Sequence, residues 1–271
     1  MNYFKYFIYG IVQGFTEFLP ISSTAHIKIV SEIFSVEDPG SSLSAIVQIG
    51  SVLSLLVFFK NDIRLLIRTN LNISSLTKNK IIRSVFIGTI SIIIFGIFIK
   101  FGIPKFYEST LRSNLLIGFV SIFTGLLMYL SDISRSKNIS LLNHSLINSF
   151  FIGLAQSFAI IPGVSRSGIT ISSALLLGWN REDAAKYSLL LGIPAISIAA
   201  FVEIYSSFNN NLLDYSFPLL ISLITAFISS LISIKILIKY VTVKGLKFFV
   251  FYKIFFGLII LIGEFDMFRF S

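Results

Sequence analysis

The sequence predicts an all-α polytopic membrane protein with an inverted-topology repeat, six transmembrane helices and two re-entrant helix-turn-helix elements. Three observations lead to this fold class. The chain is rich in apolar residues and poor in charges, its basic residues gather in alternate connections, and two apolar segments are interrupted at matching places. The apolar composition indicates a membrane protein, the basic connections indicate the orientation of the helices, and the interrupted segments indicate the repeat.

The composition excludes a soluble fold. Of the 271 residues, 55% are hydrophobic and 13% are charged, and the mean hydropathy is +0.87. A soluble domain carries roughly 25% charged residues, and this chain has too few to cover so much apolar surface. Several runs approach the roughly 20 apolar residues that cross a hydrocarbon core as a helix. We expect six such helices, over 42–59, 84–100, 114–131, 187–206, 217–238 and 248–264.

The net charge of +9 reflects the orientation of the chain in the membrane. Its basic residues cluster in four short connections, while the connections between these hold few. This is the positive-inside pattern, so the four basic connections are expected in the cytoplasm. Topology therefore explains the charge, and we expect no nucleic-acid partner. The basic clusters are Lys60, Arg64, Arg68, Lys78, Lys80 and Arg83; Arg135 and Lys137; Arg181 and Lys186; and Lys235, Lys239, Lys244 and Lys247.

Two apolar segments, 3–30 and 145–178, do not fit a simple span because proline interrupts each of them midway. The interruptions are Pro20 in the first segment and Pro162-Gly163 in the second, and a cluster of hydroxyl residues follows each. Irregular backbone at membrane depth is tolerated only where protein encloses it around a polar cavity. We therefore expect both segments to form re-entrant helix-turn-helix elements.

The two interrupted segments also resemble each other. Residues 10–15 match residues 153–158 at a constant offset, with Gln13 and Gln156 in equivalent positions. Each half continues with three spans, and this odd number requires the second half to lie inverted. Interrupted segments at matching places in inverted repeats point to a site near the bilayer midplane; the alternative is chance similarity of short apolar strings. The repeats cover approximately 1–131 and 145–264 of a single membrane domain.

The first interrupted segment carries a candidate catalytic group. Gln13 and Glu17 are four residues apart and share a helix face. A carboxylate deep in an apolar segment is expensive and marks a functional site by default; the alternative is a carboxylate at the bilayer interface or one satisfied by helix packing. After the proline, Ser22 and Ser23 can cap a new helix. His26 lies one turn further on the same face, as a catalytic group or as a hydrogen-bonded packing residue.

The second interrupted segment predicts an anion site. Arg166 is the only arginine in an apolar segment, and leaving it unpaired would cost at least ~2.5 kcal/mol. Either Glu17 or a bound phosphate should compensate its charge. The alternative to an anion-binding site is a purely structural ion pair between Arg166 and Glu17. Ser165, Ser167 and Thr170 add hydroxyls at a helix N-terminus, where anions bind readily, and arginine matches phosphate in a bidentate manner. Together the two segments supply the groups that phosphoryl transfer needs. The absence of cysteine excludes thiolate metal sites and cysteine nucleophiles.

These motifs resemble those of the undecaprenyl-diphosphate phosphatase family, also known as bacitracin-resistance proteins. The family carries an [E/Q]-x-x-x-E motif, which Gln13 to Glu17 match, followed by a Ser-rich stretch ending in His, matched by Ser22 to His26. The family's P-G-x-S-R-S-x-x-T motif matches Pro162 to Thr170 without a departure. Gln13 takes the uncharged option, so only one carboxylate of that pair is present. The resemblance covers nearly the whole chain.

The resemblance implies an enzyme that hydrolyses undecaprenyl diphosphate to undecaprenyl phosphate and inorganic phosphate, which recycles the lipid carrier of bacterial cell-wall synthesis and confers bacitracin resistance. Our hypothesis is that Ser22, Ser23, Ser165, Arg166, Ser167 and Thr170 bind the diphosphate. Glu17 would activate the attacking group or hold a divalent cation, Mg²⁺ or Ca²⁺, which both prefer oxygen ligands. His26 would transfer the proton, and the nucleophile stays open between water, a serine and this histidine.

The competing functional class is a flippase or transporter of a polyprenyl phosphate lipid, because interrupted inverted repeats are common in carriers. A flippase would need Arg166 for binding but would have no strict need for Glu17 and His26 as a catalytic pair. A membrane scaffold is a third reading. The expected partners are a polyprenyl diphosphate substrate and membrane lipid, with a homodimer left open. We expect the chain in the bacterial plasma (inner) membrane, with the site reachable from the outer leaflet.

Overall fold

The computed structural model is all-helical over the residues that it describes, which are 3–34, 42–69, 79–134, 138–207 and 216–270. Within these ranges the only strand-like pairing is one isolated bridge between Ile139 and Trp179. The all-α prediction is therefore confirmed. The chain divides into two compact units, and each unit takes residues from both halves of the sequence.

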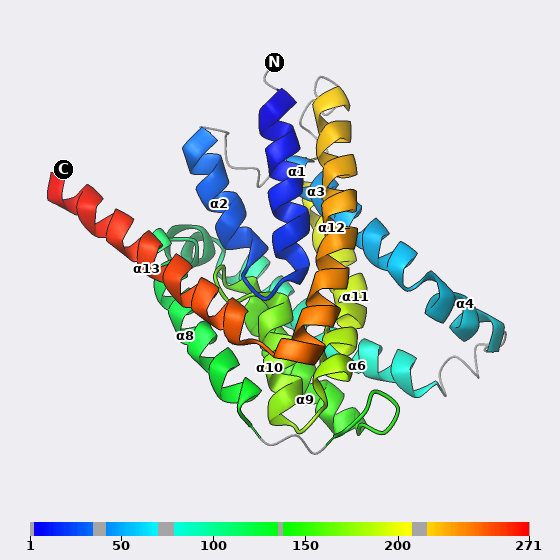
Figure 1. Ribbon diagram of the computed structural model, residues 1–271. Coiled ribbons are helices and arrows are strands. Elements are labelled where there is room, and N and C mark those ends of the chain that lie inside the picture. The colour runs from blue at the N-terminus through cyan, green and yellow to red at the C-terminus, as the bar shows by residue number, and fades with distance from the viewer. Residues whose placement is uncertain (1–2, 35–41, 70–78, 135–137, 208–215, 271) are drawn as a thin grey trace. The chain divides into compact units, whose positions relative to one another are not determined.

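The first unit contains the N-terminal helices. These are α1 (Tyr3–Phe18), α2 (Ser23–Phe34), α3 (Ser42–Phe58) and α4 (Lys60–Thr69). Two long helices of the second half complete it: α11 (Arg181–Ser207) contributes its residues from Leu189, and α12 (Ser216–Lys244) contributes its residues up to Leu237. The helices α1 and α2 form a hairpin, and α1 runs beside α12 (Figure 1).

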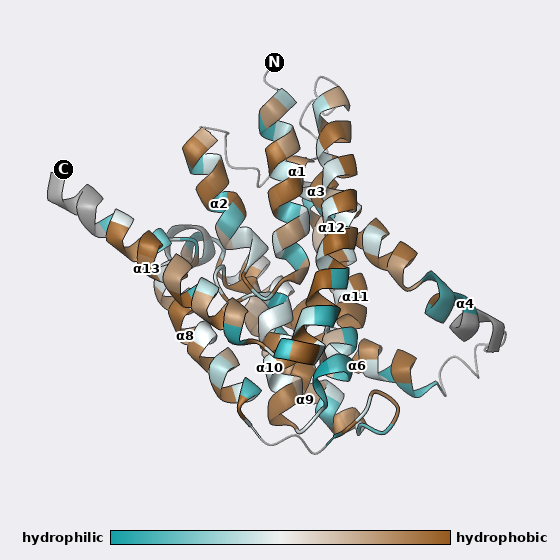
Figure 2. Cartoon of the chain, viewed as in Figure 1, coloured by the Kyte–Doolittle hydropathy of each residue, from teal (hydrophilic) through white to brown (hydrophobic). Residues whose placement is uncertain are grey.

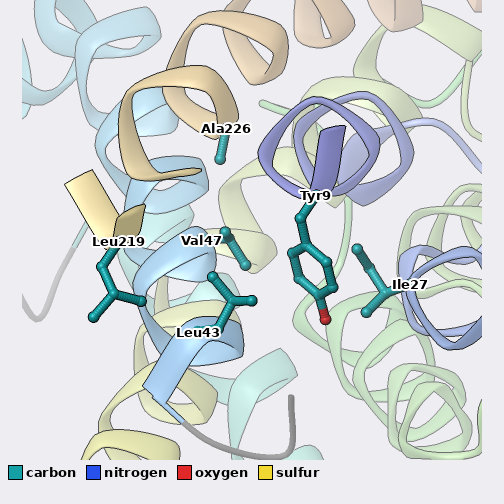
Figure 3. Close-up of a cluster of buried hydrophobic side chains, with 6 residues drawn as sticks. All are labelled: Tyr9, Ile27, Leu43, Val47, Leu219 and Ala226. Carbon is teal, nitrogen blue, oxygen red and sulfur yellow. The ribbon is translucent and has the colours of Figure 1, made fainter. Parts of the chain in front are cut away.

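The core of the first unit draws on four helices. Tyr9 of α1, Ile27 of α2 and Val47 of α3 are buried together with residues of α12, and Figure 3 shows these side chains pointing toward one another. Small residues bring α1 and α12 together, as is typical of helix pairs in membranes. A Cβ on Gly14 would lie only 2.5 Å from the carbonyl oxygen of Ala226. The buried cluster comprises Tyr9, Ile27, Leu43, Val47, Leu219 and Ala226.

The second unit contains the remaining helices. These are α6 (Lys80–Ile97), α8 (Asn114–Asp132), α9 (Leu146–Ser157), α10 (Arg166–Leu176) and α13 (Lys247–Phe270), with the first residues of α11 and the last residues of α12. Three short turns, Phe98–Gly102, Pro104–Phe106 and Tyr107–Leu111, connect α6 to α8. The helices α8 and α13 lie side by side (Figure 1). Their backbones approach closely, since a Cβ on Gly257 would lie 2.7 Å from the Gly118 carbonyl oxygen.

Four helices in the described ranges are long and apolar enough to cross a membrane, which confirms a multi-pass membrane protein. They cover Lys80–Ile97, Asn114–Asp132, Arg181–Tyr205 and Phe217–Lys244. Two expected spans differ from a simple apolar helix. The first, 42–59, forms the 17-residue helix α3. The last, 248–264, lies within α13, which also carries Lys253 and Glu264. Figure 2 shows apolar residues along most of α8 and α13, whereas α4 begins with polar residues.

The described part of the connection between the first two expected spans contains a helix that the sequence analysis did not predict. It contains α4, whose first turn holds Asp62, a carboxylate that stabilises the positive end of the helix dipole. The following helix α6 begins at Lys80 because the Asn79 side chain accepts a hydrogen bond from the Ile81 N–H group at 3.0 Å. The basic residues of this connection within 70–78, and those at 135 and 137, lie outside the described residues.

Candidate functional site

The first helix break lies between α1 and α2, and it holds the Glu17 carboxylate from both sides. The Oε2 atom of Glu17 accepts a hydrogen bond from the Gln13 amide at 3.0 Å, since the two residues are one helical turn apart. The same oxygen accepts a second hydrogen bond from the Ser23 hydroxyl at 2.7 Å, across the break. Gln13 is buried and Glu17 is half-buried. The predicted Gln13–Glu17 pair therefore exists, and the Ser23 hydroxyl holds its carboxylate; phosphate binding by Ser23 stays a prediction.

His26 lies in the first turn of α2 and is buried, with 9% of its side chain exposed. The residue before this helix, Ser22, is also buried and has a φ of 75°. Its hydroxyl accepts a hydrogen bond from the Gly163 N–H group at 3.1 Å. Ser22 therefore contacts the turn that interrupts the second apolar segment.

The second break begins where α9 ends at Ser157 and passes into a 3₁₀ turn over Phe158–Ile160. Gly163 follows with a φ of 97°, which a glycine adopts without strain. A Cβ at this position would also lie 2.9 Å from the carbonyl oxygen of Ile117 on α8. The Pro-Gly pair of the motif thus ends one helix and lets the turn pack closely against α8.

The chain re-enters a helix at Arg166, directly after Ser165. The Ser165 hydroxyl caps α10 by accepting a hydrogen bond from the Gly168 N–H group at 3.2 Å, and it lies 3.3 Å from the Ser167 hydroxyl. Ser165 has a φ of 69°. The predicted capped helix N-terminus is therefore present, with the motif serines buried in its first turn.

Arg166 and Thr170 are both held by α11, through Ser188. The Nη1 atom of Arg166 donates to the Ser188 carbonyl oxygen at 3.1 Å. The hydroxyl groups of Thr170 and Ser188 lie 2.7 Å apart, and both side chains are buried. The guanidinium is half-buried, and its contact with α11 sets the direction in which it can meet an anion.

Ser22 and Ser165 share a positive φ angle and a place directly before a helix that follows a break. In the described part of the chain, Ser22, Asn138 and Ser165 are the non-glycine residues with positive φ. Both serines immediately precede a helix, α2 in one case and α10 in the other. Such strained positions cluster at functional sites. The matched conformations agree with a repeat, while the inverted orientation of the halves stays a prediction.

Two residues escaped the sequence analysis. Ser188 lies in an apolar run within an expected span, and nothing in its neighbourhood marks it. Lys253 lies in α13, is fully buried, and donates a hydrogen bond to the carbonyl oxygen of Val164 in the second break. A lysine within an apolar span is the signal that could have drawn attention to it.

The second histidine, His144, lies away from both breaks in sequence and has a packing role. Its ring lies 4.8 Å from the Trp179 ring and 5.8 Å from the Tyr187 ring, and its Nδ1 atom is 2.6 Å from the Leu141 carbonyl oxygen. Burial lowers the pKa of His144 from its usual value and so favours the neutral ring, while the Leu141 contact opposes this shift.

A polar cavity of about 580 Å³ lies at the start of α11 and contains none of the predicted site residues. Its wall includes Asp132 and Arg181, which together with Leu246 form what we term the Asp132 cluster. Asp132 pairs with the Arg181 guanidinium at 2.7 Å and accepts a hydrogen bond from the Leu246 N–H group at 3.0 Å. The Asp132 side chain is 1% exposed. Through these contacts the cluster connects α8, α11 and the turn before α13.

The chain matches a family of known proteins over most of its length. Residues 6–259 match the family described as bacitracin resistance protein BacA, a range that includes both helix breaks. The chain belongs to this family. The family match begins in α1 and ends within α13, so it covers nearly every element of both units.

Curated relatives agree over almost their whole length. An undecaprenyl-diphosphatase of Prochlorococcus marinus subsp. pastoris is 55% identical over 263 residues, covering 96% of this chain and 99% of the relative. The protein of the same name from strain MIT 9515 is 53% identical, covering 97% and 100%. That from strain NATL1A is 40% identical and covers 95% of both chains.

Proposed function

We propose that this chain hydrolyses undecaprenyl diphosphate to undecaprenyl phosphate and inorganic phosphate. The observation that carries the proposal is the pair of helix breaks, each with a left-handed serine before a new helix and each bearing polar motif residues. The relatives named undecaprenyl-diphosphatase support it, since they match the chain across both breaks. The activity recycles the lipid carrier of cell-wall synthesis, and bacitracin resistance follows from this recycling.

Arg166 and the N-terminus of α10 bind the diphosphate in this proposal. The guanidinium offers a planar pair of donors for phosphate oxygens, and Ser188 holds it in place. The first backbone N–H groups of a helix face anions favourably. Ser22, Ser23, Ser165, Ser167 and Thr170 complete the polar lining in this proposal, and all of them except Ser23 are buried.

Glu17 is the proposed base or metal ligand. No group of three or more His, Asp or Glu residues in the described ranges could form a protein-only metal cage. A single carboxylate fits Mg²⁺ or Ca²⁺, however, because substrate phosphates and water commonly complete the shells of these ions. Glu17 would hold the cation through the carboxylate that Gln13 and Ser23 orient. The cation would neutralise charge on the phosphate oxygens.

The reaction breaks the bond between the bridging oxygen and the terminal phosphorus. A new P–O bond forms to the attacking oxygen, and the bridging oxygen leaves with the lipid as undecaprenyl phosphate. Glu17 accepts the proton of the attacking group, and His26 is placed one turn into α2 as the proton-transfer residue. Water is the simplest nucleophile, with a serine or His26 as the covalent alternative.

The proposed location is the bacterial plasma membrane. Four apolar helices of membrane length support an integral position, and the basic connections support a cytoplasmic side for α4, the start of α11 and the turn before α13. In this orientation we propose that the substrate enters from the outer leaflet, where spent diphosphate carrier is formed. The isoprenoid tail stays in lipid.

The test is phosphate release from undecaprenyl diphosphate by the purified protein in detergent, with and without EDTA. We expect Glu17→Gln and Arg166→Ala to lower kcat/KM by about 10²–10³-fold, the loss that follows removal of one group that stabilises a transition state. Glu32→Gln is the matched control, since Glu32 is exposed on α2, where it pairs with Lys28. Unchanged release by both active-site variants would refute the assignment. Binding of undecaprenyl phosphate without any hydrolysis by the wild type would favour the flippase.

A further inference from the structure

Lys253 is the least expected polar residue of the second unit. Its side chain is fully buried in α13, between the apolar residues Tyr252 and Ile254. Lysine is almost never fully buried in proteins unless it has a partner, and within membrane helices such residues mark functional sites. The partner is the carbonyl oxygen of Val164, to which the Nζ atom donates a hydrogen bond.

The position of this contact in the second break is informative. Val164 is buried, and its carbonyl belongs to the peptide group that joins it to Ser165. Ser165 is the left-handed cap of α10, and Arg166 is the first residue of that helix. The N–H group of Val164 closes the turn onto the Ile161 carbonyl at 3.2 Å. Lys253 therefore holds the carbonyl of the peptide group that precedes Ser165, and the orientation of this peptide group determines the φ of the α10 cap.

The lysine and the break rest on the same support, which is α8. The helix α13 packs closely on α8 at Gly118, and the break packs on α8 at Ile117, one residue earlier. This shared surface fixes the backbone on both sides of the Lys253–Val164 contact. The ammonium therefore has little freedom to move away from the start of α10.

Within the described residues Lys253 forms no ion pair with a carboxylate, and its hydrogen-bond partner is the Val164 carbonyl oxygen. An ammonium has three donors, and the contact with Val164 uses one of them. Lys253 and Arg166 thus bring two basic side chains to one helix start.

We propose that Lys253 is a positioning residue of the phosphate site: it holds the Val164 carbonyl and thereby sets the cap of α10 and the direction of Arg166. This inference rests on the proposed function for its substrate. A positioning role differs from a purely structural role in one respect. It requires that a substitution of Lys253 weakens phosphate binding even when the protein stays folded.

The experiment compares Lys253→Met, Lys253→Arg and wild type as full-length protein in detergent. Methionine fills similar space without a donor or a charge, and arginine keeps both. Lys244→Met is the matched control, since Lys244 is exposed at the end of α12. The measured quantities are kcat, KM for undecaprenyl diphosphate, the inhibition constant of inorganic diphosphate, and the melting temperature with and without inorganic diphosphate.

For Lys253→Met we expect both KM and the inhibition constant to rise about tenfold or more, while the protein stays folded with a melting temperature close to that of the Lys244→Met control. Lys253→Arg should recover most of the binding. The inference is overturned if Lys253→Met keeps both constants within about twofold of wild type, or if binding is lost only together with thermal stability. If wild type and Lys244→Met release no phosphate, the proposed function fails instead, and the shift in melting temperature with inorganic diphosphate still tests Lys253.

Discussion

Ser22 and Ser165 adopt φ angles of 75° and 69°, a region that L side chains rarely occupy. Each such residue costs about 1–3 kcal/mol and persists only where its surroundings compensate for it. The compensation is visible here, since the Ser22 hydroxyl accepts from Gly163 and the Ser165 hydroxyl accepts from Gly168. The strain is localised at the two places where the chain must turn back inside an apolar segment.

This strain predicts an unusual order of stability for substitutions of Ser165. Ser165→Gly removes the hydroxyl but adopts positive φ freely, whereas Ser165→Ala removes the hydroxyl and keeps the strain. We expect Ser165→Ala to be less stable than Ser165→Gly by about 1 kcal/mol. The control pair is Ser167→Gly and Ser167→Ala, inside α10, where the order should reverse. Melting temperatures in detergent measure both orders, and equal stability of the two Ser165 variants would contradict the argument.

The sequence predicted the local geometry of the two helix breaks, while the roles of the site residues stay predictions. The four-residue spacing of Gln13 and Glu17 yields the observed hydrogen bond, and the Pro-Gly pair ends a helix as expected. Ser188 and Lys253 could not be predicted in the same way, because their importance comes from contacts with residues 22 and 89 positions away. Such contacts are set by the packing of helices, which a single sequence does not specify.

At the scale of helices, glycine controls how closely pairs approach. Gly10 and Gly153 occupy equivalent positions in the two interrupted segments. A Cβ on Gly10 would lie 3.0 Å from the Ser222 Cα atom of α12, and one on Gly153 would lie 2.5 Å from the Gly88 Cα atom of α6. Each interrupted segment thus packs against one long helix through its glycine, as small residues do in membrane helix pairs.

Alanine substitutions should therefore have opposite effects at two glycines. Gly153→Ala would place a methyl group into the Gly88 backbone, and we expect a loss of about 1–3 kcal/mol. Gly96→Ala, in α6, would meet only the Ile160 side chain at 3.9 Å, and we expect a gain of up to about 1 kcal/mol because alanine favours the helix. Thermal unfolding in one detergent compares the two. Equal effects would show that the α6–α9 approach is not tight.

The helix boundaries were less predictable than the existence of the helices. The helix α12 extends to Lys244, beyond the expected end at 238, and α11 begins at Arg181, before the expected start at 187. Hydrophobic runs mark the part of a helix inside the hydrocarbon core, so polar turns that continue outside it escape this criterion. Helix ends with lysine or acidic residues in their terminal turns are of this kind.

At the scale of the whole molecule, the units cut across the repeats. The first unit joins residues 23–78 to residues 189–237, and α11 and α12 each pass from one unit into the other. The orientation of the whole chain depends on its charges, because the four basic connections are expected on one side of the membrane.

The absence of cysteine makes this orientation directly testable. In right-side-out membrane vesicles, a membrane-impermeant maleimide should label Ser109→Cys at once, since Ser109 is exposed in the connection between α6 and α8. Lys244→Cys, exposed at the end of α12, should react only after the vesicles are opened. The unsubstituted chain is the blank. The reverse pattern of labelling would show that the topology is inverted.

The Asp132 cluster also implies an order in which the protein assembles during translation. Asp132 is translated early, but its backbone partner at Leu246 follows 114 residues later. Until then the carboxylate lacks one of the donors that make its burial tolerable. The helix α8 must therefore keep this end accessible to water while four further helices are inserted. Closure of the second unit waits for the turn before α13, and a chain truncated ahead of Leu246 would lack one of the donors to the Asp132 carboxylate.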